Sequence, residues 1–269
     1  MHPDRSIASW FEGVLSLVYP TVCALCHRQR ADHRQGYVCE ACSLSVRRIG
    51  DHCCQRCGLP WSGKIVGPHA CESCRGASGS WDEARAAVIA EGVALDCIHR
   101  LKYRKEPWFA TFLSGLLNEA AVPALKGRSW QGIVPVPLHR AKLREREFNQ
   151  AERLAGPLAR ALDVPMVTDR VRRREPTASQ ASLSRDDRSR NVRSAFEAAR
   201  TDRIRGSWII VDDVLTTGAT TDAVAAVLKG LGAEQVVVWA VARAVLEPGG
   251  VWTDPPQPAL PVTSRAPHS

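Results

Sequence analysis

Four pairs of cysteines, each with two residues between them, constrain the fold of the first third of the chain. They are Cys23 and Cys26, Cys39 and Cys42, Cys54 and Cys57, and Cys71 and Cys74. Twelve residues separate the first two pairs and thirteen separate the last two. A CxxC turn presents two thiolates to one metal ion, and a second turn completes a tetrahedral site. The spacing predicts two successive four-thiolate zinc ribbons over residues 15–76, although rubredoxin-like iron uses a similar geometry.

Both predicted metals are structural, because four thiolates leave no open coordination position. Without metal, a region of this size could hardly bury enough apolar surface to fold. Two of the ten cysteines are left over. We assign Cys54 rather than Cys53 as a ligand, since "CQRCGL" has the two-residue spacing. We expect Cys97 to be a small buried apolar side chain.

The N-terminal stretch "MHPDRSIASWFEGVLSLVYP" has a short apolar patch, but Glu12 interrupts it and no small-residue cleavage site follows. It therefore does not read as a signal peptide. The apolar stretches of the chain are all much shorter than the roughly 20 residues that a membrane span needs. These features predict a cytoplasmic protein without a membrane span, in which the cysteines bind metal and form no disulfides.

The net charge of +8 is concentrated in one quarter of the chain. Residues 139–205 contain seventeen Lys and Arg but only ten Asp and Glu. Such a surplus predicts an anionic partner, which is either a phosphorylated small molecule or a nucleic acid. A solvated basic surface is the simpler alternative.

Apolar runs and helical patterns alternate after residue 82. Strands are expected at 84–92, 132–138, 164–173, 206–213 and 234–243. Helices are expected at 95–121, broken near Pro107, at 148–162, interrupted at Pro157, and at 218–232. Because the strands are almost continuously apolar, we predict an α/β domain over 82–246 with a parallel sheet and helices on both faces. The Pro-rich stretch 247–269 is predicted to be a disordered tail.

The stretch "IIVDDVLTTGATTD" (209–222) contains the strongest functional signal of this domain. Ligands of parallel sheets bind beyond the carboxyl ends of the strands, which is where Asp212 and Asp213 are expected. The following loop, Thr216–Thr220, opens a helix whose N–H groups, together with Gly218, suit a phosphate. Carboxylates tolerate a phosphate nearby only if they face a neutral, hydroxylated part of the same ligand. A ribose 5-phosphate meets both requirements.

This stretch resembles the phosphoribosyl pyrophosphate (PRPP) binding motif of type I phosphoribosyltransferases. The wider chain is similar to the ComF family (ComFC and GntX-like proteins), in which zinc ribbons precede such a domain. The supporting stretches are "HRLKYR", "VPVPLHRAKLREREFNQA" and "TASQASLSRDDRSRNVRSAF". The resemblance implies a type I phosphoribosyltransferase-like parallel sheet over 82–246, preceded by a small double zinc ribbon.

The resemblance also implies roles for individual residues. Asp212 and Asp213 would contact the ribose 2- and 3-hydroxyls, and with Arg146 they are the candidate catalytic residues. The phosphate loop would be Thr216, Thr217, Gly218, Ala219 and Thr220. The pyrophosphate would lie against His139, Arg140 and Lys142, with Arg144, Arg146 and Lys102 as further candidates. Residues 172–190 would form a flap over the substrate, and Mg²⁺ would accompany PRPP.

One residue departs from the family pattern, which reads Arg-Gly-Phe-Asn-Gln where this chain has "REFNQ". Glu147 replaces the glycine, and a side chain there would strain the turn if that glycine serves a positive φ. The departure leaves two functions open. One is transfer of the phosphoribosyl group to an unidentified acceptor. The other is PRPP binding without catalysis in natural competence, with single-stranded DNA and helicase-type competence proteins as partners.

Overall fold

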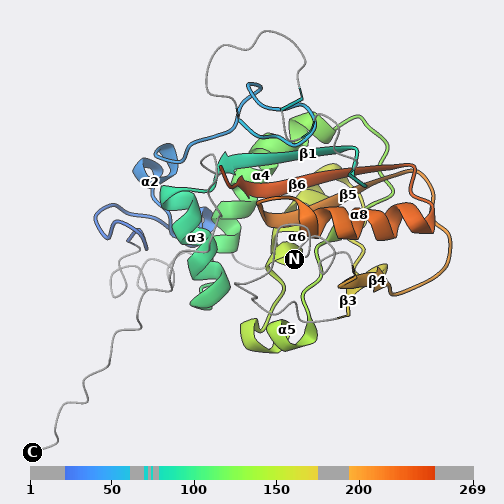
Figure 1. Cartoon of the computed structure of the whole chain (residues 1–269). Helices are drawn as coiled ribbons and strands as arrows, with labels where there is room; N and C mark the ends of the chain where they lie inside the picture. The colour runs from blue at the N-terminus through green and yellow to red at the C-terminus, as the bar shows by residue number, and fades with distance from the viewer. Residues whose placement is uncertain (1–21, 61–69, 72–73, 75–78, 175–193, 246–269) are drawn as a thin grey trace, which may run out of the picture.

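The computed structural model describes residues 22–60, 70–71, 74, 79–174 and 194–245. Its centre is a sheet of four parallel strands (Figure 1). The strands are β1 (Glu83–Ile89), β2 (Gly132–Pro135), β5 (Ser207–Leu215) and β6 (Gln235–Arg243), in the order β1-β6-β5-β2. Within this order Ile209 of β5 is in register with Ile133 of β2 and Val237 of β6. The predicted parallel sheet is confirmed.

Helices cover both faces of this sheet, as the sequence predicts. α4 (Phe109–Leu125) and α6 (Gln150–Leu162) lie on one face, and α8 (Ala219–Leu231) lies on the other (Figure 1). Ile209 and Val211 belong to the apolar cluster under α4 and α6, whereas Ile210 belongs to the cluster under α8. This alternation explains the continuous apolar run of β5, because a strand between two helical layers buries both of its faces.

The two ribbons pack against different parts of this domain. The first contains η1 (His33–Gln35) and α2 (Glu40–Leu44) and lies against α4 and α3 (Gly92–Tyr103). At Gly36, with φ of 62°, a Cβ would lie 2.7 Å from the backbone nitrogen of Phe112 in α4. The second ribbon lies against β1. At Gly58, with φ of 66°, a Cβ would lie 2.9 Å from the carbonyl oxygen of Ala84.

The expected interruption of the helix at Pro157 is wrong. α6 continues through Pro157 to Leu162. Proline removes one N–H donor from the helix, but Leu154 and Leu158 are fully buried on either side of it. Most helical stability in proteins comes from packing of an apolar face, and here that packing holds the helix together across the proline.

The strand expected at 164–173 is correct only at its end. β3 (Val171–Arg173) pairs antiparallel with β4 (Phe196–Ala198) in a separate two-stranded sheet, and Met166 makes a single bridge to Ile133. The short helix α5 (Arg140–Arg146), which follows β2, was not predicted from the sequence. The predicted tail at 247–269 lies outside the described residues, as does most of the predicted flap. Within the described ranges, no helix is both long and apolar enough to span a bilayer.

Candidate functional site

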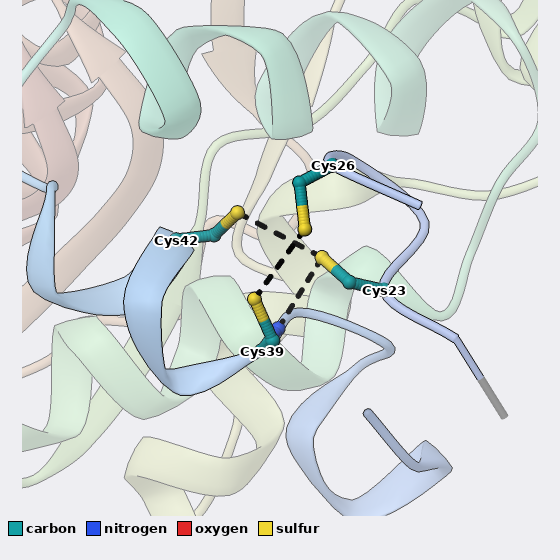
Figure 2. A group of neighbouring side chains, drawn as sticks. All are labelled: Cys23, Cys26, Cys39 and Cys42. Carbon is teal, nitrogen blue, oxygen red and sulfur yellow. Dashed lines mark hydrogen bonds between the residues drawn. The ribbon is translucent and has the colours of Figure 1, made fainter. Parts of the chain in front are cut away.

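The eight predicted metal ligands form two clusters of four cysteines, Cys23, Cys26, Cys39 and Cys42 in the first, and Cys54, Cys57, Cys71 and Cys74 in the second. Figure 2 shows the first cluster with all four sulfurs turned toward a common centre. The Sγ–Sγ distances are 3.8 Å for Cys23–Cys42 and 3.7 Å for Cys26–Cys39. A tetrahedral zinc ion with Zn–S bonds of about 2.3 Å requires sulfurs about 3.8 Å apart. The clusters therefore fit two structural zinc ions.

The local backbone prepares these thiols for metal binding. The N–H groups of Arg28 and Gln29 lower the pKa of the Cys26 thiol to about 6. Burial, with the neighbouring sulfurs, raises the pKa of Cys42. Four thiolates cannot share so small a space without a cation, and a bound metal removes this conflict. Cys53 and Cys97 are buried outside both clusters, whereas Cys54 belongs to the second, as the choice of Cys54 as the ligand requires.

The acidic pair lies near the carboxyl end of β5. Asp213 is buried, and its Oδ1 is 2.9 Å from Nζ of Lys102, at the end of α3. Asp212 is half-buried and accepts the backbone N–H of Asp213 at 2.8 Å. Burial, followed by the charge of Asp213, raises the pKa of the Asp212 carboxyl to about 7, against the lowering effects of Lys102 and Arg173. The pair can thus hold a proton near neutral pH.

Cations from three elements gather beside this acidic pair. Lys102 and Arg173 are near the acids, and Lys142 and Arg146 lie near those two cations. Burial lowers the pKa of Lys142, on α5, and the charges of Arg146 and Arg173 lower it further. Burial also lowers the pKa of Arg173, on β3, whereas the charge of Asp212 raises it. Together with Lys102, these side chains make a cationic pocket, defined as Lys102, Lys142, Arg146 and Arg173. Such a pocket suits a polyanion such as pyrophosphate.

Arg173 is the member of the cationic pocket that sequence reasoning did not name. The sequence places it only at the start of the expected flap, within the run "RRRE". No pattern distinguishes it there from Arg172, which is exposed and paired with Glu197. Strand alternation in β3 separates the two, because neighbouring side chains of a strand point to opposite faces.

The predicted phosphate loop has the geometry of an anion-binding turn. Gly218 has φ of 81° and precedes the first residue of α8. The Thr221 hydroxyl donates to the Gly218 carbonyl at 2.9 Å, and the Thr217 hydroxyl accepts the N–H of Ala219 at 3.4 Å. Thr217 is exposed, and Thr216, Ala219 and Thr220 are partly exposed. The helix N-terminus therefore presents backbone N–H groups and hydroxyls to solvent.

The predicted residues of α5 fall into two groups. Lys142 and Arg146 share one face of the helix, and the Arg146 guanidinium lies 5.2 Å from the ring centroid of Tyr103. Arg140 and Arg144 are exposed on the helix. The Nδ1 atom of His139 accepts the N–H of Ala141 at 3.2 Å, so this side chain caps the helix.

Glu147 follows α5 with φ of 70°, in the left-handed region that favours glycine. The sequence left open whether this position needs a positive φ, and the structure shows that it has one. The carboxylate of Glu147 pairs with the ammonium of Lys105, which itself has φ of 54°. Both side chains are more than half exposed. The pair joins the loop between α3 and α4 to the end of α5, beside the cationic pocket.

Comparisons with known proteins agree with this architecture. Residues 14–75 match the double zinc ribbon domain, and residues 149–250 match the phosphoribosyl transferase domain. Competence protein F of Haemophilus influenzae is 31% identical over 77% of this chain and 90% of its own length. DNA utilization protein YhgH of Escherichia coli is 32% identical over 84% of this chain and 99% of its own length.

Competence protein ComFC of Bacillus subtilis is 23% identical over 68% of this chain and 74% of its own length. The two matched domains follow the order of the structure, in which the two cysteine clusters precede most of the parallel sheet. The chain belongs to the ComF family, in which a double zinc ribbon precedes a phosphoribosyltransferase domain.

Proposed function

We propose that this protein binds PRPP together with Mg²⁺ and transfers its phosphoribosyl group to an acceptor. One observation carries the proposal: an acidic pair, Asp212 half-buried and Asp213 buried, lies between a left-handed glycine turn at a helix N-terminus and the four side chains of the cationic pocket. PRPP has the matching sequence of groups, since its ribose hydroxyls lie between a 5-phosphate and a pyrophosphate.

Each part of the site has a role in this proposal. The phosphate loop, Thr216–Thr220, binds the 5-phosphate through backbone N–H groups and hydroxyls. Asp212 and Asp213 accept hydrogen bonds from the ribose hydroxyls. Lys142, Arg146 and Arg173 bind the pyrophosphate. Lys102 then moves from Asp213 toward the pyrophosphate, because ribose hydroxyls replace it as hydrogen-bond donors to the acid.

The reaction breaks the bond between ribose C1 and the pyrophosphate oxygen, whose electron pair leaves with pyrophosphate. The acceptor supplies the electron pair of the new bond to C1. Charge develops on the leaving group, so the cationic pocket stabilises the transition state. The carboxylates beside the pocket are ligand types that suit Mg²⁺, and this ion would add charge stabilisation at the pyrophosphate.

The first experiment measures PRPP binding by calorimetry with and without Mg²⁺. Asp213→Asn should weaken binding by at least about tenfold, because the neutral amide is a poorer acceptor for two hydroxyls. Asp96→Asn is the matched control, since Asp96 is an exposed carboxylate on α3. Unchanged PRPP affinity in Asp213→Asn would show that the acidic pair does not contact PRPP. Pyrophosphate release from labelled PRPP with pooled nucleobases then tests transfer.

The second candidate function is PRPP binding without transfer, in the handling of single-stranded DNA. The names of the relatives support it, because they refer to competence and DNA utilization. The basic segment 139–205 would contact the phosphates, and a helicase-type competence protein would act with the complex. DNA affinity should then fall steeply with salt. Intact PRPP binding without pyrophosphate release would favour this function, and a salt-independent DNA affinity would count against it.

A cytoplasmic location is part of the proposal. Both cysteine clusters require reduced thiols, and the cytoplasm keeps them reduced. The described cysteines form no disulfide.

A further inference from the structure

Arg243, the last residue of β6, is a buried guanidinium with 8% of its surface exposed. Its Nη1 donates to the carbonyl oxygen of Leu215 at 3.1 Å and also to that of Thr216. The N–H of Ala244 donates to the same Leu215 oxygen at 3.0 Å. Leu215 and Thr216 lead directly into the phosphate loop. Arg243 therefore fixes the point at which this loop leaves the sheet.

A buried guanidinium is costly unless an anion compensates it. Among the described residues, Arg243 forms no ion pair with a carboxylate. Its partners are instead the carbonyl oxygens of Leu215 and Thr216. A charged donor makes stronger hydrogen bonds than a neutral one, so these bonds hold the start of the loop firmly.

A second set of contacts joins the residues just after the second ribbon to the phosphate loop. The backbone N–H of Ser80, just after the second ribbon, donates to Oδ1 of Asp222 in the first turn of α8. The Trp81 ring lies 3.6 Å from the position that a Cβ on Gly218 would take. Trp81, Leu215 and the four cysteines of the second cluster belong to one buried apolar cluster. Ser80 and Trp81, just after the second ribbon, thus pack against the end of the phosphate loop that opens α8.

We propose that Arg243 is a positioning residue for the phosphate loop and that the second ribbon supports the same loop through Ser80 and Trp81, which follow it directly. Metal in the second four-cysteine cluster orders this ribbon and thereby raises the affinity of the loop for a phosphomonoester. The part concerning phosphate rests on the proposed PRPP function. The part concerning the loop conformation does not, because it follows from contacts within the chain.

The first cysteine cluster provides an internal contrast. Its ribbon packs on another part of the domain, where Nη1 of Arg100 donates to the carbonyl of Ala24 at 2.7 Å and Gly36 approaches Phe112. These contacts reach α3 and α4 but not residues 215–222. Loss of the first metal should therefore leave the phosphate loop more ordered than loss of the second.

The test uses the full-length, zinc-loaded chain and its variants Arg243→Met and Arg243→Lys. The first readout is amide hydrogen exchange in peptides that cover residues 214–222, with peptides of α6 as the reference. We expect Arg243→Met to speed exchange in this loop by at least about tenfold, as for a lost pair of charged hydrogen bonds. Arg243→Lys should restore part of the protection, because it keeps the charge. Unchanged loop exchange in Arg243→Met at full zinc content would overturn the proposal.

The second readout is the affinity for ribose 5-phosphate and PRPP, which Arg243→Met should lower by about tenfold or more. If the wild-type chain binds neither ligand, the proposed function fails, and hydrogen exchange alone decides the role of Arg243. If the wild-type binds and Arg243→Met binds equally well, the role of Arg243 fails instead.

Cysteine variants connect this effect to the metal. Cys71→Ser should loosen residues 214–222, and Cys39→Ser should not. Arg243→Met and Cys71→Ser should be less than additive in a double-mutant cycle, because both loosen the same short loop. Full additivity, or equal effects of Cys71→Ser and Cys39→Ser, would contradict the coupling. If Arg243→Met does not fold, the comparison of the two cysteine variants decides the question.

Discussion

Lys102 and Asp213 form a buried ion pair, with Nζ 2.9 Å from Oδ1 and side chains that are 11% and 12% exposed. The two residues come from different elements, because α3 follows β1 whereas Asp213 lies on β5. A buried pair gains from its own attraction but loses the hydration of both charges. In this structure the ammonium group of Lys102 lies where the proposed function requires a hydroxylated sugar.

Lys102→Met should lower the unfolding free energy by about 3 kcal/mol, because it leaves Asp213 buried beside Asp212 without its partner. The double variant Lys102→Met/Asp213→Asn should regain most of this loss. Urea unfolding followed by circular dichroism measures both. Lys105→Met is the matched control, since its pair with Glu147 is exposed and contributes about 1 kcal/mol or less. Equal destabilisation by the two lysine variants would contradict a special role of the buried pair.

The raised pKa of Asp212, about 7, predicts a pH-dependent stability. The folded protein holds this proton more tightly than the unfolded chain, whose Asp pKa is about 3.9. This group therefore destabilises the folded state above pH 7, and its cost disappears as the pH falls from 7 toward 4. The melting temperature of wild type relative to Asp212→Asn should rise over that range. If the melting temperatures of the two proteins change equally with pH over this range, the pKa of Asp212 is not raised.

Glu147→Gly should stabilise the folded protein by about 0.5–1 kcal/mol, because glycine adopts the φ of 70° without strain. Glu147→Gln distinguishes the effect of the charge on stability from that of the backbone strain, since it removes the ion pair with Lys105 but keeps the strained φ. Thermal melts compare the three proteins. We expect Glu147→Gln to be no more stable than wild type. A stability of Glu147→Gln equal to that of Glu147→Gly would place the cost in the charge rather than in the turn.

Arg173→Met should weaken PRPP binding by about 10- to 100-fold, since charged hydrogen bonds of this kind contribute about 1.5–3 kcal/mol each. It should change ribose 5-phosphate affinity little, because that ligand lacks the pyrophosphate. Arg172→Met is the control, as its side chain is exposed and pairs with Glu197 at 2.7 Å. Calorimetry with both ligands measures the difference. A similar loss of PRPP affinity in the two arginine variants would show that Arg173 does not bind the pyrophosphate.

Metal analysis of the purified chain should find two zinc ions per molecule, one for each four-cysteine cluster. Cys39→Ser should reduce this to about one, because three thiolates hold zinc less firmly. Cys53→Ser should leave it at two, since Cys53 lies outside the second cluster although it is adjacent to Cys54. A lost zinc ion in Cys53→Ser, with zinc retained in Cys54→Ser, would reverse the ligand assignment.

The sequence by itself determined the features that depend on neighbouring residues. The CxxC spacing predicts both cysteine clusters, since each turn needs only a few consecutive residues to aim two sulfurs at one ion. The run from Ile209 to Thr220 predicts a buried strand, an acidic pair and a glycine turn, because backbone propensity and strand burial act locally. The glycine of the family pattern also raised a positive φ at Glu147 as one possibility.

Tertiary structure decided which distant residues meet at the site. Lys102, Lys142, Arg173 and Asp213 come from α3, α5, β3 and β5, and their side chains meet only after the chain has folded. Strand alternation turns Arg173 toward Asp212, although the sequence around it is uniformly basic. Packing also carries α6 through Pro157, against its local preference. Arg243 is recognisable only in the folded molecule, because its carbonyl partners are far away in the sequence.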